Sequence, residues 1–125
     1  MPTIVHFEIP ARDIQRAKNF YKNLFSWKFE KIIADKSEYL VISTKDRRGE
    51  RGLSGAIIKK TKNYVESGNY IGVNSIDESL LKVKELRGKI IIPKTLIRGH
   101  GYFAKCKDTE GNSFSLWQED KNTVT

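Results

Sequence analysis

Two polar side chains near the start of the sequence, His6 and Glu8, have the types and the spacing that proton transfer requires. They alternate with the apolar residues Val5, Phe7 and Ile9. Because successive side chains of a strand point to opposite faces, His6 and Glu8 are expected on one face and the apolar residues on the other. A neutral imidazole at His6 can serve as a general base or a ligand donor. Both residues are therefore candidate catalytic residues; a hydrogen-bonded structural histidine and an ion-paired carboxylate are the alternatives.

A second set of candidates lies in the alternating stretch near the end of the sequence. Phe114 and Leu116 alternate there with Ser113, Ser115 and Trp117. If the first two face a helix, the other three face away from it. We predict that Ser115 and Trp117 bind a ligand, with the indole as a flat wall for stacking. Core packing is the alternative role for the indole.

The segment 98–102, with the sequence Arg-Gly-His-Gly-Tyr, supplies further candidate ligand-binding residues. Its glycines let the backbone approach a ligand, and Arg98 can pair with a carboxylate or a phosphate. His100 and Tyr102, together with Ser54, complete the set that we expect to bind a ligand. The segment lacks the strand-to-helix context of a Walker or dinucleotide-binding loop, and a flexible turn is the alternative.

The sequence contains a single cysteine, Cys106, which excludes an internal disulfide. It lies in a strand pattern with no histidine nearby in sequence, so we predict that it packs in the core and is not a nucleophile. A reduced, cytoplasmic setting is the default for such a chain.

The composition is that of a single globular domain, with 125 residues, 38% hydrophobic residues and a mean hydropathy of −0.51. No apolar run approaches the roughly 20 residues of a membrane span, so no membrane partner is expected. The strand pattern that begins at Ile4 leaves no room for a signal peptide, which again favours the cytoplasm.

The formal net charge of +8 disfavours cationic ligands and permits anionic ones. Nucleic-acid binders concentrate basic residues on one element or interleave them with aromatic residues. Here the basic residues are scattered, and the densest clusters, at 45–51 and 59–62, fall in predicted loops or strand ends. A solvated basic surface is therefore the preferred interpretation, and nucleic acid is not an expected partner.

The elements that must position these candidates fall into two similar halves. Pro10 and Pro93 are expected to end strands, Asp13 and Ser75 to cap helices, and Gly88 to close the second helix. The first half is predicted as strand 4–9, helix 14–25 and strands 27–33, 38–44 and 53–59; the second is predicted as strand 70–73, helix 76–86 and strands 89–92, 102–107 and 113–117.

The two halves form an internal repeat with an offset of roughly 63 residues, which places Tyr39 opposite Tyr102 and Phe20 opposite Val83. We divide the single domain, 1–125, into module one (about 3–60) and module two (about 69–119). In each module one face of the sheet is covered by the helix. The two uncovered faces are expected to curl around a common cleft, which is where ligands tend to bind.

A tandem βαβββ repeat that opens with Val-His-Phe-Glu-Ile-Pro resembles the vicinal oxygen chelate superfamily, which includes glyoxalase I, bleomycin-resistance proteins and extradiol dioxygenases. The resemblance covers nearly the whole chain and is strongest to small bacterial glyoxalase-like proteins. Repeat and resemblance together predict an α+β fold of tandem βαβββ modules that form a curved mixed sheet around a cleft. The other motifs that carry the resemblance lie at 17–21, 25–27, 101–103, 108–112 and 116–118.

The resemblance also implies where a metal would bind. Glyoxalase I holds a divalent cation through residues on its first, fourth, fifth and eighth strands. His6 matches the first of these, whereas the others fall within Ser54-Gly55-Ala56, at Gly68 or Asn69, and at Ser115. One imidazole is too few donors to replace the hydration shell of the ion. We therefore expect no cofactor, although Glu8 and Glu119 are conceivable substitute ligands.

By resemblance, the chain is expected to be a glyoxalase-like protein that binds or transforms a small metabolite in the inter-module cleft. It would lack the full glyoxalase I metal site, and if it is an enzyme, it would be a lyase or isomerase. The alternative is a protein that sequesters a small molecule without turnover, as bleomycin-resistance proteins do. The basic charge argues against cationic bleomycin itself. The expected partners are a small molecule, for which an anion is permitted, and a second copy of the chain in a homodimer.

Overall fold

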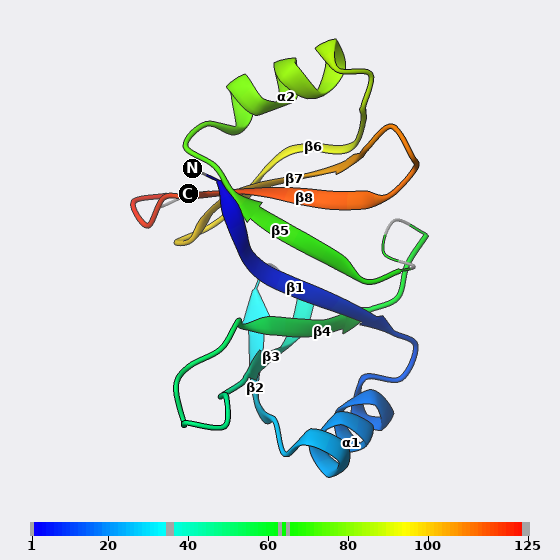
Figure 1. Ribbon diagram of the computed structural model, residues 1–125, viewed down its shortest axis with the longest axis vertical. Helices are drawn as coiled ribbons and strands as arrows, with labels where there is room; N and C mark the ends of the chain where they lie inside the picture. Colours follow the sequence, from blue (N-terminus) through cyan, green and yellow to red (C-terminus); the bar gives the residue numbers. More distant parts are fainter. Residues whose placement is uncertain (1, 35–36, 63, 65, 124–125) are drawn as a thin grey trace. The chain divides into compact units, whose positions relative to one another are not determined.

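The computed structural model describes residues 2–34, 37–62, 64 and 66–123. Within these residues the order strand, helix and three strands occurs twice (Figure 1). The fold is therefore α+β with two βαβββ modules, as predicted. The elements are β1 (Thr3–Ala11), α1 (Ile14–Phe25), β2 (Lys28–Ala34), β3 (Ser37–Ser43) and β4 (Gly55–Lys59), followed by β5 (Gly68–Gly72), α2 (Ile76–Glu85), β6 (Lys89–Ile97), β7 (Gly101–Lys107) and β8 (Ser113–Glu119).

Module one forms a compact unit from His6 to Ser67. Its strands are hydrogen-bonded in the order β2-β3-β4-β1, with β1 parallel to β4 and the other pairs antiparallel. Phe7 and Ile9 of β1 point toward α1, as the alternation predicted. They pack with the other residues of the cluster under this helix: Leu40, Ile42, Ile57, Ala11, Ile14, Ala17, Tyr21, Trp27 and Phe29.

Module two forms the second compact unit, from Gly68 onward, together with the residues that precede His6. Its strands are hydrogen-bonded in the order β5-β8-β7-β6, with β5 parallel to β8. Phe114 and Leu116 face α2, as predicted. They belong to a cluster completed by Ile76, Ala104, Cys106, Val73, Leu80, Val83, Ile90 and Tyr102. Cys106 is fully buried in this cluster, which confirms its packing role.

Both predicted helix caps are formed. The Asp13 carboxylate accepts a hydrogen bond from Arg16 N–H (3.0 Å), and the Ser75 hydroxyl accepts one from Glu78 N–H (3.2 Å). Each bond satisfies one of the amide groups that a helix leaves free at its N-terminus. A second bond at α2, from Ile76 N–H to Gln118 Oε1 (2.9 Å), ties this helix to β8.

The same turn precedes the last strand of each module. Asp46 accepts hydrogen bonds from the amides of residues 48 and 50, and Asp108 does so from those of residues 110 and 112. In both turns the fourth residue is a glycine with positive φ, 81° at Gly49 and 82° at Gly111. The turn pairs and the helix caps are each 62 positions apart in the sequence. The predicted offset of 63 is therefore one residue too long, and in a strand one residue exchanges the two faces.

The predicted stop at Pro93 is wrong, because β6 continues through it to Ile97. β6 lies at the edge of its sheet, and its pairing with β7 is irregular between Ile92 and Thr95. A proline can be accommodated on an edge strand at such an irregularity because the ladder does not need its missing donor there. Pro10 likewise lies one residue inside β1, which ends at Ala11.

The end of α2 also differs from the prediction. The residue with the left-handed conformation is Arg87 (φ 70°), not Gly88. Gly88 is required for a different reason. A Cβ atom there would lie 2.9 Å from both the Lys107 carbonyl oxygen and the Val83 side chain. The glycine therefore allows close packing of the chain after α2 against β7.

Among the residues described, neither helix has the length and apolar character needed to cross a membrane.

Candidate functional site

The face of module one that α1 leaves uncovered contains a row of paired residues. Glu8 of β1 lies opposite Ala56 of β4, which lies opposite Val41 of β3, and Val41 lies opposite Glu30 of β2. Paired residues of neighbouring strands share a face of the sheet. The two ends of the row differ in exposure: Glu8 is only 9% exposed, whereas Glu30 is exposed. The row thus ends in a buried carboxylate.

Tyr64, in the connection after β4, lies close enough to Glu8 to feel its charge. The pKa of Tyr64 is raised, first by burial, then by the negative charge of Glu8 and by Tyr39. The phenol therefore stays protonated and can donate a hydrogen bond over the whole physiological range. Since Tyr39 lies in β3, the cluster of Glu8, Tyr39 and Tyr64 is assembled from three separate segments.

His6 precedes Phe7 in β1 and so belongs to the same uncovered face as Glu8. Burial lowers the pKa of His6 below 6.5, which keeps the imidazole neutral near pH 7 and able to accept a proton. Ser54 lies beside this part of β1, because its carbonyl oxygen accepts a hydrogen bond from Phe7 N–H (3.2 Å). The structure thus brings three of the predicted site residues, His6, Glu8 and Ser54, to the middle of β1 and the start of β4.

The uncovered face of module two contains a comparable row. Lys105 of β7 lies opposite Ser115 of β8, which lies opposite Tyr70 of β5. Their exposed fractions are 6%, 5% and 8%. Trp117, two residues after Ser115, is half-buried on the same face, opposite Phe103. Ser115 and Trp117 therefore lie on the face turned away from α2, as the alternation predicted.

Tyr102 lies on the opposite face of this sheet. It packs in the cluster under α2, and the Lys94 ammonium group is 4.5 Å from its ring centroid. The sheet therefore separates Tyr102 from Ser115 and Trp117, contrary to the expectation that they bind ligand together. The physical reason is the strand alternation: Tyr102 shares its face with Ala104 and Cys106, which are buried under α2.

Arg98 and His100 are exposed in the turn between β6 and β7. The turn is held by hydrogen bonds from Gly99 N–H to Thr123 and from His100 N–H to the Ile97 carbonyl oxygen. The structure places neither side chain with the buried row of Lys105 and Ser115. Their predicted ligand-binding role remains a prediction.

The sequence did not identify Tyr39, Tyr64, Tyr70 and Lys105, which belong to the rows or lie near Glu8. For Lys105 the signal was present, because a lysine alternating with apolar residues in a strand belongs to the face away from the core. For Tyr64 no local pattern exists, since the connection that carries it has neither strand nor helix periodicity.

Comparisons with known proteins identify the family. The family model of the Glyoxalase/Bleomycin resistance protein/Dioxygenase superfamily matches residues 3–116. The chain belongs to this superfamily. It is 28% identical over 112 residues to a glyoxylase-like domain-containing protein of Didymella fabae, which covers 87% of this chain and 88% of that protein.

Solved structures show the same fold. A variant of the methylmalonyl-CoA epimerase of Streptomyces coelicolor, in complex with 2-nitronate-propionyl-CoA, has a TM-score of 0.69 at 12% identity, covering 98% of this chain and 97% of that one. A hypothetical protein of Bacillus halodurans has a TM-score of 0.67 at 14% identity and covers 99% of both chains. At these identities the likeness concerns the fold alone.

The positions that hold the metal in glyoxalase I carry few donor atoms in this chain. At the fourth-strand position Ala56 is 2% exposed and carries no donor atom, and at the eighth-strand position Ser115 offers a hydroxyl group. Among the residues described, no three His, Cys, Asp or Glu side chains lie together as a metal site would require. The donor set therefore does not fit that metal.

Proposed function

We propose that this superfamily member binds, and as an enzyme transforms, a small polar metabolite at the uncovered face of module one around Glu8. The observation that carries the proposal is the burial of this carboxylate. Removing a carboxylate from water costs free energy even when it has partners, so stability alone would favour an apolar residue there. The location of the ligand in a cleft between the modules remains a prediction.

The residues around Glu8 suit proton abstraction from carbon. In this step the C–H bond of a substrate carbon next to a carbonyl group breaks, and the proton passes to the Glu8 carboxylate. The electron pair moves to the carbonyl oxygen. The Tyr64 hydroxyl can donate a hydrogen bond to that oxygen, and neutral His6 can accept a proton as an alternative base. Such a step is common to isomerases and lyases.

Binding can be tested by thermal shift with a panel of small metabolites, among them carboxylates, sugar phosphates and methylmalonyl-CoA. Glu8→Gln removes the charge of the buried carboxylate, and Glu30→Gln makes the same change at the exposed end of the same row. A true ligand should stabilise the wild type and Glu30→Gln but not Glu8→Gln. Equal stabilisation of all three proteins would disprove the role of Glu8.

Catalysis can be distinguished from sequestration in D₂O. If Glu8 removes a proton from the bound metabolite, NMR should detect deuterium at that carbon with the wild type and not with Glu8→Gln. Binding without deuterium incorporation would instead support the alternative function, a protein that sequesters its ligand.

A site that works without a metal should bind added divalent ions only weakly. Ni²⁺ and Zn²⁺ should bind more weakly than about 1 μM and should not create hemithioacetal isomerase activity, because His6 alone leaves the ion largely hydrated. The check is the metal content after purification without chelators or an affinity tag, for the wild type and for His6→Ala. Near-stoichiometric metal that is lost in His6→Ala would overturn the expectation.

A further inference from the structure

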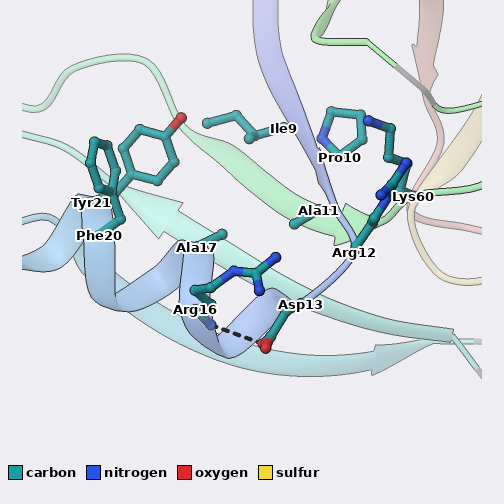
Figure 2. A pocket seen from close by; sticks show the side chains of 10 residues that line it. All are labelled: Ile9, Pro10, Ala11, Arg12, Asp13, Arg16, Ala17, Phe20, Tyr21 and Lys60. Atoms are coloured by element: carbon teal, nitrogen blue, oxygen red, sulfur yellow. Dashed lines mark hydrogen bonds between the residues drawn. The ribbon is translucent and has the colours of Figure 1, made fainter.

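A second, separate feature of module one is a surface hollow of about 580 Å³ where β1 ends and α1 begins (Figure 2). It lies on the α1 side of the sheet, whereas Glu8 lies on the other side. The residues that line it are Ile9, Pro10, Ala11, Arg12, Asp13, Arg16, Ala17, Phe20, Tyr21 and Lys60.

Three cationic residues from three segments line this hollow. Arg12 follows β1, Lys60 follows β4, and Arg16 lies in the first turn of α1. β1 and β4 are parallel and end side by side, and Lys60 N–H donates to the Ala11 carbonyl oxygen (2.9 Å). The Lys59 ammonium group donates to the Arg12 carbonyl oxygen (2.7 Å). The fold therefore fixes the backbone at Arg12 and Lys60, which are 48 positions apart in the sequence.

These positive charges are not neutralised by carboxylates. Across the part of the chain that the structure describes, none of the three cations forms an ion pair. Asp13 is the single acidic residue of the lining, and one of its oxygens already accepts the Arg16 N–H. Figure 2 shows the Arg16 guanidinium group directed into the hollow. The lining therefore carries three positive charges and one negative charge, and an anion would reduce the repulsion among the like charges.

The remaining wall of the hollow is apolar and includes an exposed aromatic ring. Phe20 is 60% exposed, and its ring meets that of Tyr21 edge to face, with 5.2 Å between centroids. The Phe20 ring is thereby held with much of its surface open to solvent. A hollow that contains both an exposed flat ring and guanidinium groups is suited to a ligand that combines an aromatic group with an anion.

We propose that this hollow binds a small phosphorylated aromatic ligand, such as a nucleoside monophosphate. Arg12, Arg16 and Lys60 hold the phosphate, and the Phe20 ring stacks on the aromatic group. A phosphate is favoured over a carboxylate because a dianion with three terminal oxygens can use all three cations, two of them through forked guanidinium donors. The proposal is independent of the function proposed for Glu8.

The test is calorimetric titration of the full chain with adenosine 5′-monophosphate. Arg16→Gln should weaken binding roughly 10- to 100-fold, the usual cost of a lost charged hydrogen bond. Arg47→Gln removes the same charge from an exposed loop outside the hollow and should change the affinity little. Asp13→Asn keeps a helix-capping side chain but removes the one negative charge, and should tighten binding several-fold.

The stacking role is tested separately. Phe20→Ala should weaken binding of the nucleotide and leave binding of inorganic pyrophosphate unchanged. Circular dichroism confirms that each variant is folded before titration. The proposal is overturned if the nucleotide does not bind, or if Arg16→Gln and Arg47→Gln weaken binding equally. It is likewise overturned if a single-stranded oligonucleotide binds and Arg47→Gln weakens it as much as Arg16→Gln, since the attraction would then be that of the whole basic surface.

Discussion

The two modules share a plan for the backbone but differ in what their helices do. Asp13 and Ser75 cap the two helices at equivalent positions, and Asp46 and Asp108 form the same turn. Beyond these positions the helices diverge. α1 has no fully buried residue and no acidic residue in its first turn, whereas α2 buries Ile76 completely and has two acidic residues in its first turn.

The difference shows which parts of the repeat the fold requires. Caps and turns satisfy backbone groups, so they recur wherever the backbone has the same path. The outer surface of a helix has no such requirement. α1 exposes Phe20, Leu24 and Phe25, and of these Phe20 lines the hollow. Thus module one combines the buried Glu8 on one side of its sheet with a basic hollow on the other.

The largest difference in stability between the modules is expected when the first residue of each helix is replaced by alanine. Ile76→Ala removes a side chain that is fully buried, and should destabilise the protein by about 4 kcal/mol. Ile14→Ala changes the equivalent first residue of α1, which is only half-buried, and should cost about 2 kcal/mol. Urea unfolding of both variants measures the difference. Equal losses would mean that the two helices are anchored alike.

A smaller difference in stability is expected when two buried glycines, Gly101 and Gly55, are each replaced by alanine. At Gly101 a Cβ atom would collide with the Gln118 carbonyl oxygen, and φ is 149°. At Gly55 it would collide with the ring of Phe7, a side chain that can move. Gly101→Ala should therefore cost about 3 kcal/mol and Gly55→Ala about 2 kcal/mol.

Gly99→Ala is the control for these variants. Gly99 has a φ of 76° and no atom within 4 Å of a Cβ, so it isolates the conformational cost, about 1 kcal/mol. If Gly101→Ala costs no more than this control, the close approach to Gln118 does not limit the site.

The two helix caps should differ less in the stability that each contributes. Asp13→Ala removes both a hydrogen bond and the negative charge at the N-terminus of α1, and should cost about 1.5 kcal/mol. Ser75→Ala removes a hydrogen bond alone, and Asp77 and Glu78 remain near the start of α2, so about 1 kcal/mol is expected. Thermal unfolding at low and high salt separates the two terms, since salt screens the charge and not the hydrogen bond. A salt-independent difference would refute the role of charge.

The smallest effect concerns pH. Burial lowers the pKa of His6 below its value of 6.5 in the unfolded chain, so the unfolded chain takes up the proton first. The free energy of unfolding should therefore fall as pH drops below about 6.5, and the loss is complete below the folded-state pKa. His6→Gln should flatten this dependence in urea titrations from about pH 8 to about pH 5. The exposed His100→Gln is the matched control and should retain the slope of the wild type.

The sequence by itself determined the order of elements, both helix caps and the residues that face each helix. Phe7 and Ile9 lie under α1, and Phe114 and Leu116 under α2, as predicted. These features depend on residues only a few positions apart. Alternation, capping and turn formation are local, and so they can be read without knowing where the rest of the chain lies.

The tertiary structure alone decided which distant residues meet. The register of neighbouring strands places Lys105 and Tyr70 on either side of Ser115, although the three residues lie far apart in the sequence. Pro93 could remain inside β6 because that strand lies at an edge, which no local pattern indicates. Tyr64 lies near Glu8, and Lys60 is hydrogen-bonded to Ala11, only because parallel β1 and β4 bring their flanking segments together. The same pairing brings Arg12 and Lys60, which are far apart in the sequence, to the lining of one hollow.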